Sequence, residues 1–279
     1  MAKSAARPNT LASIPGNVVL VGAGKMGGAL LDGWLGRKLP PKKIVVIEPK
    51  PSKAIKALAR RGVRINPKTP VGKVAAMVIA VKPQTAPEAL PVLASLAGSG
   101  TVVVSIMAGR TLGFLETHFD KAAVIRAMPN TPAAIGRGIT VAVGNRRVTA
   151  AARKLAHNLL AATGAVEWVK DEALMDAVTA VSGSGPAYVF LLAEAMAQAG
   201  VAAGLPTALA ERLARETVAG AGELLHRLDA PAATLRQNVT SPGGTTAAAL
   251  DVLMSRDGIG PVMTKAVAAA TRRGKELAG

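Results

Sequence analysis

Short apolar runs alternate with helical patterns over the first 170 residues of the chain. The runs have the length of buried strands, and they predict strands at 18–21, 44–47, 63–65, 77–81, 101–106, 123–126, 139–143 and 165–169. Between most of these runs, apolar side chains recur at helical spacing, which predicts helices at 26–36, 53–61, 87–97, 112–118 and 149–162. This alternation is typical of an α/β fold with a doubly wound, mostly parallel sheet, here over residues 16–170.

After residue 170 the pattern becomes almost entirely helical. It predicts helices at 174–181, 187–203, 206–228, 245–254 and 261–277, so residues 171–279 are expected to form an all-α domain. Many of these helix faces consist of Ala and Gly, which pack closely but bury little apolar area. We therefore expect a homodimer through this half, in which a second copy completes the core. Residues 1–15 lack the apolar segment of a secretory signal and are expected to form a disordered tail.

The segment NVVLVGAGKMGGALL, at 17–31, joins the first predicted strand to the first predicted helix through a glycine turn. Gly22 permits the tight turn, Gly24 leaves room for a pyrophosphate beside the backbone, and Gly27 lets the helix lie close to the strand. The second strand ends in Glu48, a type of residue that accepts hydrogen bonds from an adenosine ribose. Glycine turns also occur in ordinary βα loops, but in this context the turn predicts a Rossmann-type dinucleotide-binding domain.

Three further loops, at 82–84, 107–109 and 128–132, follow strands at the edge where such sheets bind ligands. Each is either a cofactor contact or a tight turn made by Pro or Gly, and the residues alone leave both interpretations open. Two glycine-rich stretches, at 182–186 and 240–246, precede helices in the second half. Their Ser and Thr residues suit ordinary N-caps, but helix starts bare of side chains favour a site for a carboxylate.

The positive charge is concentrated in the first half of the chain. The formal net charge is +17, and residues 1–170 contain 25 Lys and Arg against 6 Asp and Glu. A basic surface attracts nucleic acid, but it equally attracts any phosphorylated ligand. Only 2 Trp, 1 Tyr and 3 Phe are present, and no nucleic-acid-binding module is recognisable. We therefore expect a dinucleotide rather than nucleic acid as the phosphorylated partner.

Cysteine is absent, which excludes disulfides, catalytic thiolates and Cys-ligated metal sites. We expect a cytoplasmic protein without a metal centre. The apolar run at 74–81 is far too short to cross a bilayer, so no membrane partner is expected.

Several motifs together resemble pyrroline-5-carboxylate reductase. They are GAGKMG at 22–27, AVKP at 80–83, IRAMPNTP at 125–132, SGSGPAYVF at 182–190 and NVTSPGGTT at 238–246. The resemblance covers the chain from about residue 17 to its end. It implies NAD(P)H-dependent reduction of (S)-1-pyrroline-5-carboxylate to L-proline, the last step of proline biosynthesis. It also implies a Rossmann domain followed by a helical dimerisation domain, with dimers that can assemble into decamers.

The resemblance also implies roles for particular residues. The cofactor contacts would be Gly22, Ala23, Gly24, Lys25, Met26, Gly27, Glu48, Lys50, Ala80, Val81, Lys82, Pro83, Met107, Ala108, Asn130 and Asn238. The substrate carboxylate would lie at Ser241, Gly243, Gly244 and Thr245. The hydroxyl of Thr246 would lie near the ring nitrogen as the catalytic group, and Asp229 stands where some members have a glutamate near that nitrogen.

The choice between the two nicotinamide cofactors is open at this level. Glu48 favours an unphosphorylated ribose, whereas Lys50 and Lys53 are placed to pair with a 2′-phosphate. We expect NADPH as the cofactor, with NADH usable.

Two other functions share parts of this pattern. A β-hydroxyacid dehydrogenase has a similar glycine turn and helical second domain, but it uses a lysine in the helix after a glycine-rich segment, and 187–203 contains no lysine. The other is a non-enzymatic dinucleotide sensor or assembly protein that has kept the fold. Oxidation of NADPH by pyrroline-5-carboxylate would distinguish all three.

Overall fold

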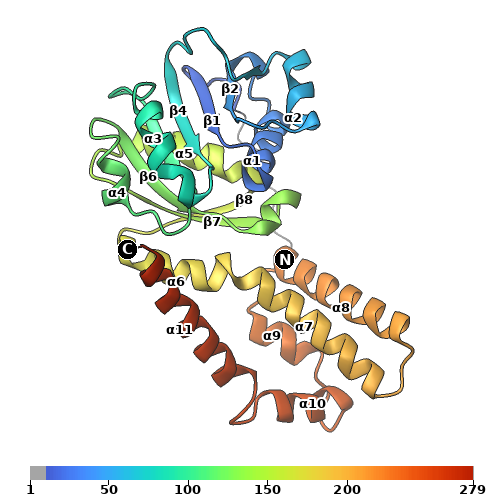
Figure 1. Cartoon of the computed structure of the whole chain (residues 1–279). Coiled ribbons are helices and arrows are strands. Elements are labelled where there is room, and N and C mark those ends of the chain that lie inside the picture. The colour runs from blue at the N-terminus through green and yellow to red at the C-terminus, as the bar shows by residue number, and fades with distance from the viewer. Residues whose placement is uncertain (1–10, 279) are drawn as a thin grey trace. The chain divides into compact units, whose positions relative to one another are not determined.

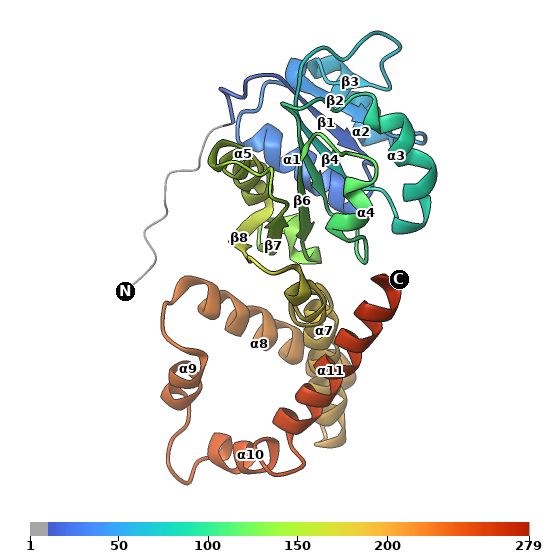
Figure 2. The same ribbon diagram turned by 90° about the vertical axis from the view of Figure 1, so that its left-hand side faces the viewer.

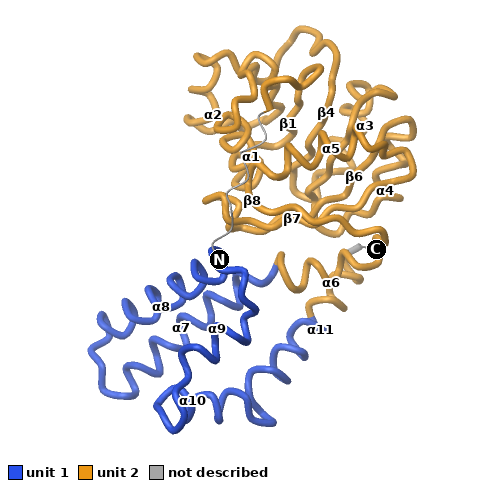
Figure 3. Tube along the Cα trace, turned by 180° about the vertical axis from the view of Figure 1, so that it is seen from behind, with its two compact units in different colours: residues 1–7, 184–269 blue, residues 8–183, 270–279 orange. Residues whose placement is uncertain are grey.

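The computed structural model describes residues 11–278, and this part of the chain divides into two compact units (Figure 3). One unit contains the sheet and takes residues 11–183 together with 270–278, and the other is helical and takes Ser184–Ala269. Of the fifteen residues expected to form a tail, 1–10 lie outside the described residues. Leu11 and Ile14, by contrast, are buried in the core of the unit that contains the sheet.

Eight strands form one sheet in the order β3-β2-β1-β4-β5-β6-β7-β8 (Figure 1). The strands are β1 (Asn17–Val21), β2 (Ile44–Ile47), β3 (Arg64–Ile65), β4 (Val74–Ile79), β5 (Val102–Ser105), β6 (Ala123–Met128), β7 (Gly138–Gly144) and β8 (Gly164–Trp168). Neighbouring strands are parallel except for β6 and β7. The strand order reverses between β1 and β4, which creates a crevice for a ligand outside their carboxyl ends. The predicted fold class is confirmed.

Helices cover both faces of the sheet (Figure 1 and Figure 2). They are α1 (Lys25–Gly36), α2 (Lys53–Ala57), α3 (Ala86–Ala94), α4 (Leu112–Glu116) and α5 (Ala150–Leu160). Side chains of a strand alternate between faces, so Val18 packs in one core with Trp34 of α1, and Val19 packs in the other with Leu90 of α3. The indole N–H of Trp34 donates to the carbonyl oxygen of Leu159, 2.9 Å away, and so joins α1 to α5.

Two strands, β4 and β6, have boundaries that differ from the predicted ones by more than one residue. β4 begins at Val74 rather than at residue 77, because Ala75 and Ala76 are weak strand formers that the neighbouring strands nevertheless bury. β6 continues through Arg126 to Met128, although a charged residue usually marks the end of a buried strand. Arg126 is only 5% exposed.

The helical unit contains α7 (Gly185–Ala202), α8 (Thr207–Arg227), α9 (Ala232–Asn238), α10 (Thr245–Leu253) and α11 (Ile259–Ala278) up to Ala269. The buried residues of the α7–α8 pair are small, namely Ala197, Ala210 and Ala214. The short helix α9 was not predicted. Large apolar side chains remain exposed on several of these helices, including Phe190 and Val252. No helix in the described residues combines the length and the hydropathy that a membrane span requires.

The segment predicted as a helix at 174–181 has mixed geometry. It contains α6 (Met175–Val178) followed by a π-helix at Thr179–Gly183. The hydroxyls of Thr179 and Ser182 donate to main-chain oxygens four residues earlier, at 2.8 and 2.9 Å, and such bonds compete with regular helix geometry. By its packing, the segment belongs to the unit of the sheet.

Candidate functional site

The glycine turn lies at the carboxyl edge of the sheet, against the end of β4. Gly22 has φ +87°, and a Cβ there would lie 2.8 Å from the carbonyl oxygen of Ala80. The N–H of Ala80 donates to the carbonyl oxygen of Val21 at 2.7 Å, so the turns after β1 and β4 meet. A Cβ on Gly27 would collide with the carbonyl oxygen of Gly22. The structure therefore brings together Gly22, Gly27 and Ala80, three of the predicted cofactor residues.

The start of α1 is open enough for a phosphate. A Cβ on Gly24 would meet no atom within 4 Å, and no side chain of the described residues caps the helix. Ala23, Lys25 and Met26 complete the turn, and Lys25 is exposed. An uncapped helix start with free space beside its backbone suits a negatively charged group, so this end of the site fits the phosphates of a dinucleotide.

Glu48 connects the end of β2 to the glycine turn. Its Oε2 accepts a hydrogen bond from the N–H of Ala23 at 2.8 Å, and its Oε1 accepts one from the N–H of Lys50 at 3.0 Å. The side chain of Asn66 holds the backbone of Glu48 through two further bonds, at 2.9 and 2.8 Å. Both carboxylate oxygens of Glu48 thus already accept backbone N–H groups. The side chains of Lys50 and Lys53, which follow Glu48 in the sequence, are exposed.

The loops after β4 and β5 are joined by an arginine that the sequence did not reveal. Val81 and Lys82 lead into a short helical turn at Pro83–Thr85, and Met107, Ala108 and Gly109 follow β5. Arg110 donates from Nε and Nη2 to the carbonyl oxygen of Pro83, at 3.2 and 2.9 Å. Its guanidinium also lies over the ring of Phe114, 4.7 Å from the centroid. Arg110 thus fixes the loop after β5 against the loop after β4.

The loop after β6 is held by its own side chains. Asn130 Oδ1 accepts a hydrogen bond from the N–H of Ile139 at 2.9 Å, which ties the loop to the start of β7. Gly183 packs against Met128, because a Cβ on Gly183 would lie 2.6 Å from Met128 Cε. The predicted contact residue Asn130 therefore has a structural partner within the sheet.

Behind these loops lies an ion cluster that was also not predicted. Arg126 Nη1 lies 2.9 Å from Glu172 Oε1, and Nη2 lies 3.8 Å from Asp176 Oδ1. The available signal was the single charged residue inside the strand pattern AVIRAM, which a buried strand accepts only with a partner. The sequence does not identify that partner, because Glu172 lies 46 residues away.

The predicted substrate residues occupy one loop of the helical unit. Ser241, Gly243 and Gly244 form the turn that leads into α10, whose first residues are Thr245 and Thr246. Gly243 has φ +70°, and the N–H of Gly244 donates to the carbonyl oxygen of Ser241 at 3.1 Å. Within the described residues, no side chain caps α10. The loop therefore offers its hydroxyls and the uncapped start of α10 to an anion.

The two other predicted residues of this unit lie outside that turn. Asn238 is the last residue of α9, before the turn, whereas Asp229 lies in the connection between α8 and α9 and is exposed. Across the described residues, no group of three His, Asp or Glu side chains is arranged to hold a metal ion.

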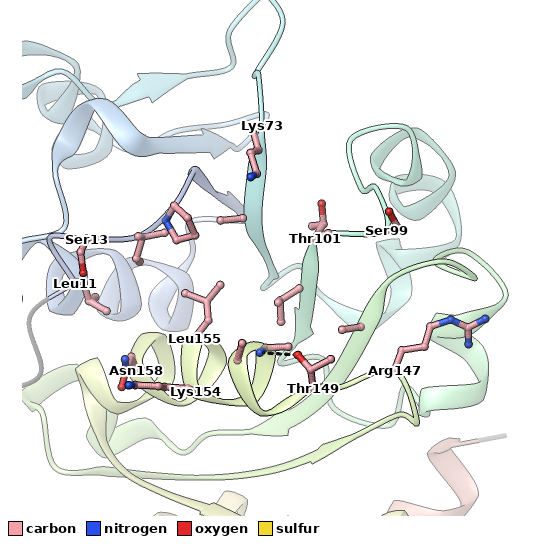
Figure 4. A pocket seen from close by; sticks show the side chains of 18 residues that line it. Leu11, Ser13, Lys73, Ser99, Thr101, Arg147, Thr149, Lys154, Leu155 and Asn158 are labelled. Carbon is pink, nitrogen blue, oxygen red and sulfur yellow. Dashed lines mark hydrogen bonds between the residues drawn. The ribbon is translucent and has the colours of Figure 1, made fainter.

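A hollow of about 500 Å³ lies at the opposite, amino edge of the sheet (Figure 4). Its lining includes Leu11 and Thr101, together with the basic side chains of Lys73, Arg147 and Lys154. Figure 4 shows the three basic side chains well apart, without a shared point to which they are directed. None of the predicted site residues lines this hollow. The carboxyl edge, with the glycine turn, therefore remains the candidate site.

Comparison with known proteins gives a consistent result over nearly the whole chain. Residues 172–277 match the family model for pyrroline-5-carboxylate reductase dimerisation, and residues 17–109 match the model for coenzyme F420-dependent NADP oxidoreductases. A pyrroline-5-carboxylate reductase of Synechocystis is 42% identical over 265 residues, which cover 92% of this chain and 97% of that protein. One of Pseudomonas aeruginosa is 36% identical, with 94% and 96% covered.

Two solved structures are also similar. The pyrroline-5-carboxylate reductase of Coxiella burnetii has a TM-score of 0.86 at 33% identity, with 94% of this chain and 98% of that chain covered. The Plasmodium falciparum pyrroline carboxylate reductase, solved with NADP bound, has a TM-score of 0.78 at 27% identity, with 95% and 99% covered.

Proposed function

The chain belongs to the pyrroline-5-carboxylate reductase family, and from this membership we propose that it reduces (S)-1-pyrroline-5-carboxylate to L-proline with a nicotinamide cofactor. The observation that carries the proposal is the junction of Gly22, Gly27 and Ala80 beside the uncapped start of α1. It provides the backbone N–H groups and the space that a dinucleotide pyrophosphate requires.

The residues of this chain would act mainly by holding and orienting. The bound nicotinamide supplies the hydride, and a proton must reach the ring nitrogen of the cyclic imine. We assign the substrate carboxylate to the N–H groups and hydroxyls of Ser241, Gly243, Gly244 and Thr245. The Thr246 hydroxyl would hold the water that protonates the nitrogen. Once this proton has converted the imine to an iminium, its carbon is electrophilic enough that positioning and exclusion of bulk water are sufficient without a strong acid or base.

Thr246→Ala tests the catalytic assignment. Turnover of pyrroline-5-carboxylate should fall by about tenfold or more, while the affinity for NADPH stays unchanged, because the hydroxyl acts on the substrate alone. Thr264→Ala is the matched control, since among the described residues the Thr264 hydroxyl donates only to the carbonyl oxygen of Gly260 in its own helix, at 3.0 Å. An unchanged turnover in Thr246→Ala would remove this residue from the mechanism. Wild-type protein that leaves NADPH unoxidised in the presence of the substrate would refute the function itself.

We propose NADPH as the preferred cofactor, with NADH as a weaker one. Both carboxylate oxygens of Glu48 accept backbone N–H groups, which leaves them less available to a ribose diol. The exposed Lys50 and Lys53 supply positive charge for a 2′-phosphate. Lys50→Ala and Lys53→Ala should therefore lower kcat/KM for NADPH and leave kcat/KM for NADH unchanged. Equal losses with both cofactors would contradict this assignment.

We propose a homodimer through the helical unit as the working form, with a decamer as the larger assembly. The exposed apolar residues of α7, α8, α10 and α11 support the dimer. We assign the basic surface to attraction of the cofactor rather than to nucleic acid, and we place the enzyme in the cytoplasm without a membrane partner.

A further inference from the structure

A buried arginine stands on the face of the sheet that is covered by α3 and α4. Arg126 is 5% exposed, and its neighbours on this face of the sheet include Val124, Val141 and Val143. A guanidinium in such surroundings loses its hydration and is tolerated only when it is paired. An apolar side chain of similar volume would fill the same space at no such cost. Packing alone therefore does not account for an arginine at this position.

Glu172, the partner of Arg126, also binds the start of helix α4. Glu172 Oε1 lies 2.9 Å from Arg126 Nη1 and also accepts the N–H of Leu112 at 2.8 Å. Leu112 is the first residue of α4, and only Arg110 and Thr111 separate it from the loop at 107–109. One carboxylate oxygen thus joins the end of β6 to the element that follows β5.

Asp176, the other partner, contacts the last turns of α11. A Cβ on Gly274 would lie 3.3 Å from both Cβ and Oδ1 of Asp176, so the helix passes close to this carboxylate. The same end of α11 passes the loop after β5, because a Cβ on Gly109 would lie 3.2 Å from the carbonyl oxygen of Leu277. The cluster therefore lies behind the loops after β5 and β6 and is braced by α11.

We propose that Arg126 is a positioning residue for hydride transfer, which with Glu172 and Asp176 fixes the loops at 107–109 and 128–131. The inference rests on the proposed function and on the family resemblance, which implies that Met107, Ala108 and the loop at 128–131 lie beside the nicotinamide. Among the residues that the structure describes, no hydrogen bond or ion pair links the cluster to the glycine turn, which is expected to hold the pyrophosphate. Loss of the cluster should therefore disturb the reactive end of the cofactor and leave the other end bound. Misplacement by about 1 Å is sufficient to lower a rate by about 100-fold.

The test uses Arg126→Met, which keeps an unbranched apolar stem and removes the charge, and Arg126→Lys, which keeps the charge. Three quantities are measured: kcat with pyrroline-5-carboxylate, the fluorescence of bound NADPH, and the Kd of 2′-phospho-ADP-ribose. The last is a cofactor fragment that lacks the nicotinamide, so it reports only the glycine turn and the site of the 2′-phosphate. In Arg126→Met we expect kcat to fall by about 10- to 100-fold and the nicotinamide fluorescence to change, with the Kd of the fragment unchanged. Arg126→Lys should restore part of kcat.

Arg227→Met is the matched control, because Arg227 is an exposed arginine that also pairs with a glutamate, Glu223, at 2.7 Å. It should leave all three quantities unchanged. If Arg126→Met does not fold, Glu172→Gln and Asp176→Asn provide the same test, since these side chains are 28% and 17% exposed and their changes remove no buried volume.

Three results would overturn the proposal. They are an unchanged kcat in Arg126→Met, an unchanged nicotinamide fluorescence, or a loss of fragment binding in proportion to the loss of kcat, which would indicate general damage to the fold. Failure of the proposed function is distinguishable, because wild-type protein would then not turn over the substrate, while the fluorescence and the fragment still report on positioning.

Discussion

At the scale of single residues, two glycines of the same turn are required for different physical reasons. Gly27 is required by the fold, because a Cβ there would collide with the carbonyl oxygen of Gly22. Gly24 is not, because a Cβ there would meet no atom within 4 Å and its φ of −70° suits any residue. We therefore propose that Gly24 lacks a side chain so that a ligand can approach its backbone.

Gly24→Ala should weaken NADPH binding while the protein remains folded. We expect Kd to rise by about tenfold or more, which corresponds to about 1.4 kcal/mol. The free energy of unfolding should fall by at most about 1 kcal/mol, the usual effect of alanine at an N-cap. Calorimetric titration gives the first quantity and urea denaturation the second.

Gly27→Ala is the comparison for that variant. It should lower the free energy of unfolding by about 1–3 kcal/mol or more, because the turn must open to admit the methyl group. Gly24→Ala that binds NADPH as tightly as the wild type would show that no pyrophosphate approaches this backbone.

At the scale of elements, helix α1 packs against the end of α5 through a glycine. A Cβ on Gly33 would lie 2.6 Å from the carbonyl oxygen of Ala162, a backbone atom that has little freedom to move. Gly36 lies one turn further along the same helix, and a Cβ there would meet nothing within 4 Å. Alanine substitutions at Gly33 and Gly36 therefore separate the effect of packing on stability from the effect of helix propensity.

Gly33→Ala should destabilise the protein by about 1–3 kcal/mol through overpacking. Gly36→Ala should be neutral or stabilise it by up to about 1 kcal/mol, since alanine is the better helix former. Urea denaturation of both variants measures the difference. A Gly33→Ala protein as stable as the wild type would mean that α1 moves away from α5 at little cost.

The sequence predicts elements well where local signals determine them. The strands of the parallel sheet are visible because both of their faces are buried, and the glycine turn is visible because a positive φ and a close approach select glycine. The sequence does not predict helix α9, because short helices depend on tertiary contacts. It also does not predict the π-helix at Thr179–Gly183, because the hydroxyl bonds of Thr179 and Ser182 alter the local geometry.

In the candidate site, too, local signals predict single residues but not their partners from distant segments. Glu48 was expected from its place after β2, but the sequence does not show that its carboxylate holds the N–H of Ala23. Likewise, nothing near Arg126 in the sequence indicates Glu172 as its partner. Interactions between distant segments depend on the packed structure, so local sequence patterns do not predict them.

At the scale of the whole molecule, the helical unit leaves a large apolar surface uncovered within one chain. Phe190 is 68% exposed, Leu191 63% and Val252 70%. Monomeric proteins rarely expose so many large apolar side chains together, so a second copy is the expected cover. The match of residues 172–277 to a dimerisation family agrees with this assignment.

Phe190→Lys should shift the protein from dimer to monomer at micromolar concentration, because a desolvated charge opposes burial of this surface. Sedimentation velocity measures the shift. Val92→Lys is the matched control: Val92 is 72% exposed, but it lies on α3 beside the sheet and should not affect assembly. If both Phe190→Lys and Val92→Lys remain dimeric, the interface lies on another surface.

The bare apolar side of α7 has one more consequence, which concerns mass action. If dimerisation buries the apolar side chains of each copy, the melting temperature of the wild type should rise with protein concentration, whereas that of a strictly monomeric variant should not. Dilution would then lower the stability of the folded enzyme, because it favours dissociation of the dimer. In a cell, the amount of the protein would help to set how long each molecule survives.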